Sequence, residues 1–195
     1  MDETRQTLIQ RIACGEPGAW VEANAIYAPL IRNWLGRYRL QPSDVDDVTQ
    51  EVMKVLVAQI KDFEHNGRTG AFRNWLRTTT VNIARNSLRK RNTPVGGGGT
   101  DFQIAMAELE DPHSKLSKEF DDEHNRHVVK YLLKEIATEF KPITMRVFKM
   151  HVVDGVSVDG TADSLGVSRA SVHASKSRVL RKLRQRAGEL LVETL

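Results

Sequence analysis

The chain has 195 residues, of which 40% are hydrophobic, 6% aromatic and 28% charged. This composition is typical of a soluble globular protein with one or two cores, and it excludes both a large multidomain enzyme and a disordered chain. No apolar stretch approaches the roughly 18 residues that a membrane span needs, and the acidic start Met1-Asp2-Glu3 is unlike the basic start of a secretory signal. We therefore expect a cytoplasmic protein without membrane insertion, whose single cysteine, Cys14, is a small buried residue.

The net charge of +4 is unevenly distributed. Residues 1–91 hold 14 basic and 10 acidic side chains, residues 92–125 hold 2 and 8, and residues 126–195 hold 13 and 7. Two windows, residues 68–91 and 169–186, carry seven Lys or Arg each and no Asp or Glu. A single basic run is often only a solvated helix face, but two acid-free runs in separate modules favour a polyanionic partner.

Apolar residues recur at helical spacing along the first half of the chain, which predicts helices. A short helix over residues 4–13 is expected to end at Gly15, and Pro17 opens a longer one. Ser43 is the expected N-cap of a third helix, and a fourth covers residues 71–91. The expected core positions are Trp20, Ala23, Tyr27, Leu30, Ile31, Trp34 and Tyr38 in the second helix, Val45, Val48, Val52, Val55, Leu56, Ile60 and Phe63 in the third, and Phe72, Leu76, Thr79, Ile83 and Leu88 in the fourth.

The polar faces of the third and fourth helices differ in chemistry. The third presents Asp47, Gln50, Glu51 and Lys54 at spacings of three and four. The fourth combines arginines and amides with one aromatic residue, which suits unstacked bases better than a closed duplex. Taken alone, that aromatic is more often a core residue. The face consists of Trp75, Thr78, Asn82, Arg85 and Arg89, beside Asn74 and Asn86.

Residues 92–112 contain Pro94, the run Gly96–Gly99 and an acidic patch, a composition typical of a flexible linker. The sequence therefore predicts an all-α protein with two small helical domains, residues 1–91 and 113–195, joined by an acidic linker. The second domain is expected to begin with a helix that reaches Phe140. Its apolar positions are Leu116, Phe120, Val128, Leu132 and Ile136.

Residues 157–184 have the spacing of a helix-turn-helix. Ala162 is small where two helices would cross, Gly166 suits a positive φ in the turn, and Ser168 is the expected N-cap of the second helix. Val172 and Val179 anchor that helix. Arg169, Ser171 and His173 are expected to face a major groove, while Lys176, Arg178 and Lys182 suit phosphates.

Four segments together resemble an extracytoplasmic-function, or group IV, sigma factor of bacterial RNA polymerase. They are Gly15-Glu16-Pro17-Gly18-Ala19-Trp20 with Tyr27-Ala28-Pro29-Leu30, then Asp44 to Val52, then Gly70 to Leu76 with Asn82 and Leu88 to Arg91, and finally Val156 to Leu183. In order, they resemble the start of region 2, its polymerase-binding segment, the segments that melt and read the −10 element, and region 4, which reads the −35 element.

The resemblance implies a factor that binds core RNA polymerase and directs promoter-specific initiation. Its partners would be core RNA polymerase, promoter DNA as duplex and as melted non-template strand, and, where one exists, an anti-sigma factor; we expect a monomer. The implied polymerase-binding residues are Asp44, Asp47, Gln50, Glu51 and Lys54. The implied −10 residues are Asn66, Arg68, Arg73, Asn74, Trp75, Arg77, Thr78, Asn82, Arg85, Asn86 and Arg89, and the −35 residues are Ser168, Arg169, Ser171, His173, Lys176, Arg178 and Lys182.

The sequence departs from the family pattern at Gly160, Thr161 and Lys176, where the family usually has an acid, a large aliphatic and an apolar residue. These departures bear on −35 recognition. A glycine inside a helix costs about 1 kcal/mol.

An enzyme and an independent regulator are the alternatives. Gly96–Gly99 lacks the Gly-Lys-Ser/Thr that completes a phosphate loop. His124 and His127 have no third histidine or cysteine nearby, so a hydrated polar helix is expected rather than a metal site. We therefore expect no enzyme activity, catalytic residue, metal or cofactor. The alternative function is a helix-turn-helix regulator that binds duplex DNA without polymerase.

Overall fold

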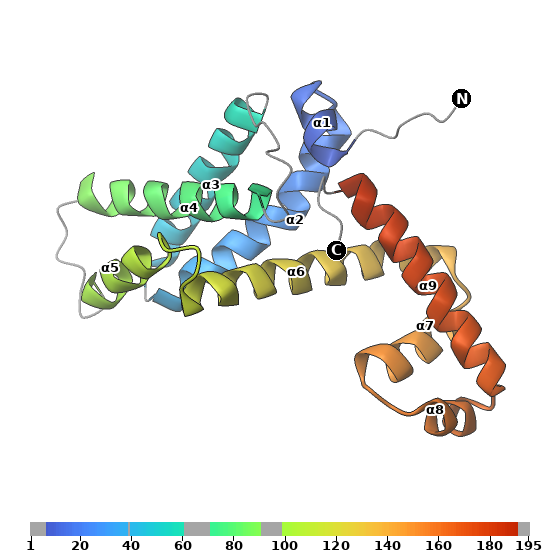
Figure 1. Ribbon diagram of the computed structural model, residues 1–195. Coiled ribbons are helices and arrows are strands. Elements are labelled where there is room, and N and C mark those ends of the chain that lie inside the picture. Colours follow the sequence, from blue (N-terminus) through green and yellow to red (C-terminus); the bar gives the residue numbers. More distant parts are fainter. Residues whose placement is uncertain (1–6, 39, 61–70, 91–98, 191–195) are drawn as a thin grey trace. The chain divides into compact units, whose positions relative to one another are not determined.

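The computed structural model describes residues 7–38, 40–60, 71–90 and 99–190, and every regular element in these ranges is helical (Figure 1). The expected all-α class is thereby confirmed. The chain divides into two compact units, an N-terminal unit, Met1–Val128, and a C-terminal unit, Val129–Leu195. Each is described by itself below.

The N-terminal unit is built on three packed helices, α2, α3 and α4, to which α1, α5 and the first part of α6 are added. Prolines at the first positions of α2 and α3 open these helices, because a proline lacks the N–H that the first turn leaves unsatisfied. The bounds are α1 Leu8–Ala13, α2 Pro17–Leu35, the 3-10 turn η1 Gly36–Tyr38, α3 Pro42–Gln59, α4 Ala71–Lys90, α5 Gly99–Glu108 and α6 Lys115–Ile136.

Two local expectations at helix ends are wrong. The third helix begins at Pro42 with Gln41 as its N-cap, so Ser43 lies inside the first turn rather than capping it. The proline ring presets the helical φ at Pro42, so the helix begins at Pro42, one residue before the expected cap. Cys14 is exposed, because it is the C-cap of the short helix α1 and lies beyond the last buried residue of that helix, Ile12.

The helical periodicity identifies most of the N-terminal core. Ile31, Val52, Leu56, Phe72 and Leu76 are all buried, from α2, α3 and α4. Several of the expected core residues are only half-buried, and the side chains of two lie outside the described residues. The half-buried ones are Trp20, Tyr38, Val55, Thr79 and Ile83, and the two outside are Phe63 and Leu88.

The expected linker, residues 92–112, is partly helical. Helix α5 occupies Gly99–Glu108 and contacts α4, while residues 91–98 lie outside the described part of the chain. The first half of α6 also packs into the N-terminal unit, since the ring of Phe120 lies 5.4 Å from that of Trp34 in a T-shaped pair. The compact N-terminal unit therefore extends to Val128 instead of ending near residue 91.

His124 is buried, which corrects the expectation of a hydrated polar helix around it. Its side chain is 0% exposed and stacks on Tyr27 with ring centroids 6.0 Å apart. Neither ring nitrogen has a hydrogen-bond partner among the described residues. Burial, reinforced by the positive charge of Arg73, lowers the pKa of His124 to about 3.

This burial predicts a pH-dependent stability of the N-terminal unit. Between the usual histidine pKa of 6.5 and about 3, only the unfolded chain binds the proton at His124. The free energy of unfolding should therefore fall by about 1.4 kcal/mol per pH unit as pH drops below 6.5. All three tryptophans lie in this unit, so denaturant titrations followed by tryptophan fluorescence report on it.

A His124→Phe variant isolates the effect from that of the carboxylates, because it keeps a ring against Tyr27 and removes the titrating group. We expect the stability difference between the two proteins to widen in favour of the variant from pH 7 to pH 5. If the free energy of unfolding depended on pH in the same way in both proteins, His124 would bind its proton as readily in the folded chain as in the unfolded chain, and the prediction would be wrong.

The C-terminal unit contains a helix-turn-helix formed by α8 and α9. Gly166 ends α8 with φ 62°, the left-handed conformation expected there, and the Ser168 hydroxyl accepts the N–H of Ser171 at 3.1 Å as the expected cap of α9. The elements are the end of α6, the 3-10 turn η3 Ala137–Glu139, α7 Pro142–Phe148, the π-helical turn η4 Lys149–Val153, α8 Val158–Leu165 and α9 Arg169–Leu190.

The core of the helix-turn-helix consists of Val147, Ala162 and Val172, one residue from each of α7, α8 and α9. Gly160 lies in the first turn of α8, and a Cβ there would meet both the hydroxyl of Ser157 and the side chain of Val156 at 3.2 Å. The backbone N–H of Gly160 donates to that same hydroxyl at 3.1 Å, which caps α8. A close capping contact thus accounts for glycine at this position.

Thr161 places an unsatisfied hydroxyl in this core. The residue is 0% exposed, and its Oγ1 has no hydrogen-bond partner in the described part of the chain. Thr161→Val keeps the shape and removes the buried polar atom, so we expect the C-terminal unit to gain about 1 kcal/mol of stability. Amide exchange of α9 in native conditions measures this gain, and slower exchange is expected. Unchanged or faster exchange would mean that the hydroxyl is solvated or paired.

Candidate nucleic-acid interface

The outer side of α4 carries a stripe of neutral hydrogen-bonding side chains. Asn74, Thr78, Asn82 and Asn86 are all exposed, and they follow one another at intervals of four residues. Side chains four apart lie on one face of a helix. The three amides and one hydroxyl, called here the amide stripe, offer both donors and acceptors to base edges.

The arginines of α4 beside the amide stripe are paired with residues from the predicted linker and α6. Arg85 forms an ion pair with Glu110, and Arg73 donates to the side-chain oxygen of Asn125. Both arginines were expected to contact the −10 element, but here acidic or amide groups of the same chain hold them. Helical periodicity does not predict these partners. The sequence signal that points to them is the acidic patch that follows the acid-free basic helix, since opposite charges pair.

Arg77 is the clearest correction among the expected −10 residues. Its side chain is 2% exposed, and its two terminal nitrogens donate to Asp121 Oδ1 at 2.9 Å and to Asn74 Oδ1 at 2.6 Å. Burial raises the pKa of Asp121, and the charges of Arg77 and Arg73 oppose that rise. A guanidinium enclosed in this way does not contact DNA in this conformation.

Other expected −10 residues are half-buried or lie outside the described residues. Trp75 is half-buried and stacks on Phe72 with centroids 5.8 Å apart, so it belongs in part to the core. Asn66 and Arg68 lie outside the described residues, as does the side chain of Arg89.

The expected polymerase-binding face of α3 is exposed except at its start. Asp47, Gln50, Glu51 and Lys54 are exposed, and Lys54 Nζ lies 3.3 Å from Glu51 Oε2. Asp44 is buried, because it lies in the first turn of α3 beside the core residue Val45. The available face therefore consists of four of the five expected residues.

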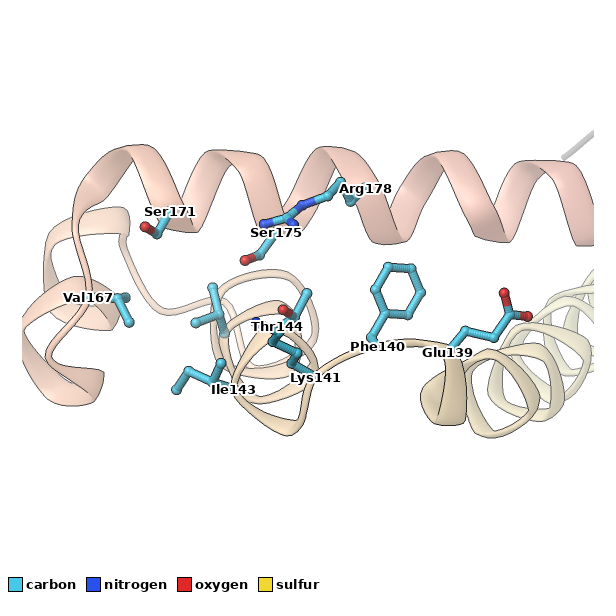
Figure 2. A pocket seen from close by; sticks show the side chains of 10 residues that line it. Glu139, Phe140, Lys141, Ile143, Thr144, Val167, Ser171, Ser175 and Arg178 are labelled. Carbon is cyan, nitrogen blue, oxygen red and sulfur yellow. The ribbon is translucent and has the colours of Figure 1, made fainter.

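The expected −35 residues lie on two sides of α9. Arg169, His173 and Lys176 are exposed and share one side by their helical spacing. Ser171 and Arg178 lie on another side, where they line an open pocket of about 490 Å³ between α7 and α9 together with Lys141, Ile143, Thr144, Ser175 and other residues (Figure 2).

Ion pairs engage two of the expected −35 cations. Arg169 Nε lies 2.5 Å from Asp159 Oδ1 of α8, although 72% of the arginine side chain is exposed. Lys182 Nζ lies 2.6 Å from Glu139 Oε2, and that lysine side chain is mostly covered. Lys182 therefore contributes to packing against η3 more than to a phosphate-binding surface. Arg169 pairs at the surface, where ion pairs are weak, so its guanidinium stays available to DNA.

Within the described ranges, no three His, Cys, Asp or Glu side chains lie close enough together to hold a metal ion. No helix in these ranges is long and apolar enough to cross a membrane.

Comparison with known proteins gives a family match within the N-terminal unit. Residues 25–93 match the family model of sigma-70 region 2, and this range includes every expected polymerase-binding and −10 residue. The chain is also similar to a chain of the solved RsbN-BldN complex, with 16% identity, a TM-score of 0.32, and coverage of 91% of this chain and 98% of that one. None of the curated proteins matches.

The match shows that residues 25–93 resemble sigma-70 region 2, the domain class that the sequence indicates for this part of the chain. The helix-turn-helix of α8 and α9 follows this region in the same chain. The region 2 expected from the sequence is thereby confirmed for residues 25–93.

Proposed function

We propose that the chain binds core RNA polymerase through the exposed face of α3 and directs initiation at promoters with two separate DNA elements. The observation that carries the proposal is the pair of unlike surfaces on neighbouring helices of one domain. Helix α3 offers a mixed-charge face that suits a protein, and α4 offers the amide stripe that suits unstacked bases.

The amide stripe supports a role in holding the melted non-template strand. Its side chains are neutral, so they contribute hydrogen bonds with base edges more than attraction to phosphates. Asn82 and Asn86 lie on the exposed face, and half-buried Trp75 directly follows Asn74 at the other end of the stripe. Asn66 and Arg68, to which the sequence resemblance gives the same role, lie outside the described residues.

The helix-turn-helix supports reading of the duplex −35 element. A second helix with an exposed, basic early face is the arrangement that enters a major groove. His173 and Lys176 lie on one side of α9 and Arg178 on another, so that base edges and phosphates can be contacted from one helix. Residues 129–195 would then act as region 4. An anti-sigma factor is a further partner that the sequence resemblance allows.

An association experiment tests this proposal against the alternative of an independent regulator. The purified full chain is applied to promoter duplex with and without core RNA polymerase, and complexes are separated by size. A sigma factor of this kind should co-elute with the polymerase and bind promoter duplex only in its presence. Specific binding of the chain alone, with no association with polymerase, would favour the independent regulator.

A further inference from the structure

We propose that Arg77 and Asp121 are positioning residues that fix the orientation of Asn74, so that Asn74 reads one base of the melted strand as a hydrogen-bond donor. This inference rests on the proposed function. It assigns to a buried arginine of α4, and to an acid of α6, a part in base selection.

The geometry of the guanidinium carries the inference. Arg77 is 2% exposed, and its fork reaches in two directions, to Asp121 Oδ1 at 2.9 Å and to Asn74 Oδ1 at 2.6 Å. A planar guanidinium held by a carboxylate has little freedom left, so the second nitrogen is fixed in space. Asp121 lies on α6, and α6 is held to the N-terminal core through Phe120 and His124.

The consequence for Asn74 is a fixed amide polarity. An unrestrained asparagine can rotate its amide and present either the oxygen or the NH₂ group to a ligand. Here Arg77 occupies the oxygen of Asn74, while the residue as a whole is exposed. The NH₂ group is thus the part presented outward, and it selects bases that place an acceptor at that position.

The test is the base-preference profile of the full chain with core RNA polymerase on promoters whose −10 element is randomised. Asn74→Ala should lower the preference at one position of that element by about tenfold. Arg77→Lys keeps the charge opposite Asp121 but lacks the fork that also holds Asn74. It should lower the preference at the same position by roughly threefold or more, and it should have no further effect in an Asn74→Ala background.

Two additional variants separate positioning from general loosening of α6. Asp121→Asn should weaken the preference at the Asn74 position, since it frees the guanidinium from its anchor. Arg37→Lys changes an arginine that also pairs with α6, through Glu123, but that lies in η1. It should leave the profile unchanged, and circular dichroism should show equal helix content for all variants.

The outcomes distinguish this inference from the proposed function. If Asn82→Ala alters the profile while Asn74→Ala or Arg77→Lys does not, α4 still reads DNA and the positioning role is wrong. If no stripe variant alters the profile, both are wrong. An Arg77→Lys effect that persists undiminished without Asn74 would make the arginine a merely structural residue.

Discussion

Replacing Gln50 by alanine together with Glu51 by arginine is expected to reduce polymerase-dependent transcription by about a hundredfold or more. Both side chains are exposed on α3, and Glu51 holds Lys54 at 3.3 Å. A reversed charge in a protein interface brings like charges together, which costs several kcal/mol. Alanine and arginine are good helix formers, so the helix should persist. Multi-round transcription with purified core enzyme measures the loss.

A matched control reverses a charge elsewhere in the same unit. Gln103→Ala with Glu119→Arg makes the same two chemical changes at exposed positions of α5 and α6. This variant should retain transcription close to that of the unaltered chain. Equal activity of the α3 variant and this control would reject α3 as the polymerase-binding face.

Replacing Lys176 and Arg178 by alanine is expected to weaken promoter binding and its dependence on salt. A polymerase complex whose sigma factor neutralises roughly five to seven phosphates should show a slope of about −4 to −6 in log affinity against log salt. Loss of two cations should make the slope shallower by about 1.8 and lower the affinity at 0.1 M salt roughly fiftyfold. Titration of labelled promoter duplex at several salt concentrations gives both quantities.

Lys130→Ala with Lys134→Ala removes the same charge from exposed positions of α6. If the salt dependence of promoter binding comes from α9, this control should show the same slope of log affinity against log salt as the unaltered protein. Identical slopes for all three proteins would show that α9 contributes no phosphate contacts.

The helices and their buried faces could be predicted from the sequence, because a helix repeats its apolar side chains every three to four residues. The period located Leu30 and Trp34 in α2 and Val48 and Val52 in α3, and all four are buried. Turn chemistry was also local enough to predict, as Gly166 and Ser168 show.

The errors concern contacts between segments far apart in the chain. The acid-free sequence of α4 predicts that Arg77 is available to DNA, but its partner Asp121 is contributed by α6. The same applies to His124, whose ring is buried against Tyr27 of α2. Periodicity describes one helix at a time and does not show which other helix covers a polar face.

The acidic segment differs from the expected linker over Gly99–Glu108 for a related reason. Its glycines and charges are typical of a linker, yet Ala105, Met106 and Leu109 are buried there. Three apolar side chains, two on α5 and one directly after it, are enough to hold this short segment against a neighbouring surface, and Glu110 pairs with Arg85. The side chains of α4 in the candidate site are therefore held in part by residues that follow residues 91–98 in the chain, such as Glu110 and Asp121.

Run-off transcription with purified core polymerase, with and without the full chain, on a library of genomic fragments tests the central claim most directly. The claim predicts discrete transcripts that require both the chain and the polymerase, and whose start sites share two conserved upstream elements. Transcripts that are the same without the chain, or a chain that never associates with the polymerase, would contradict it.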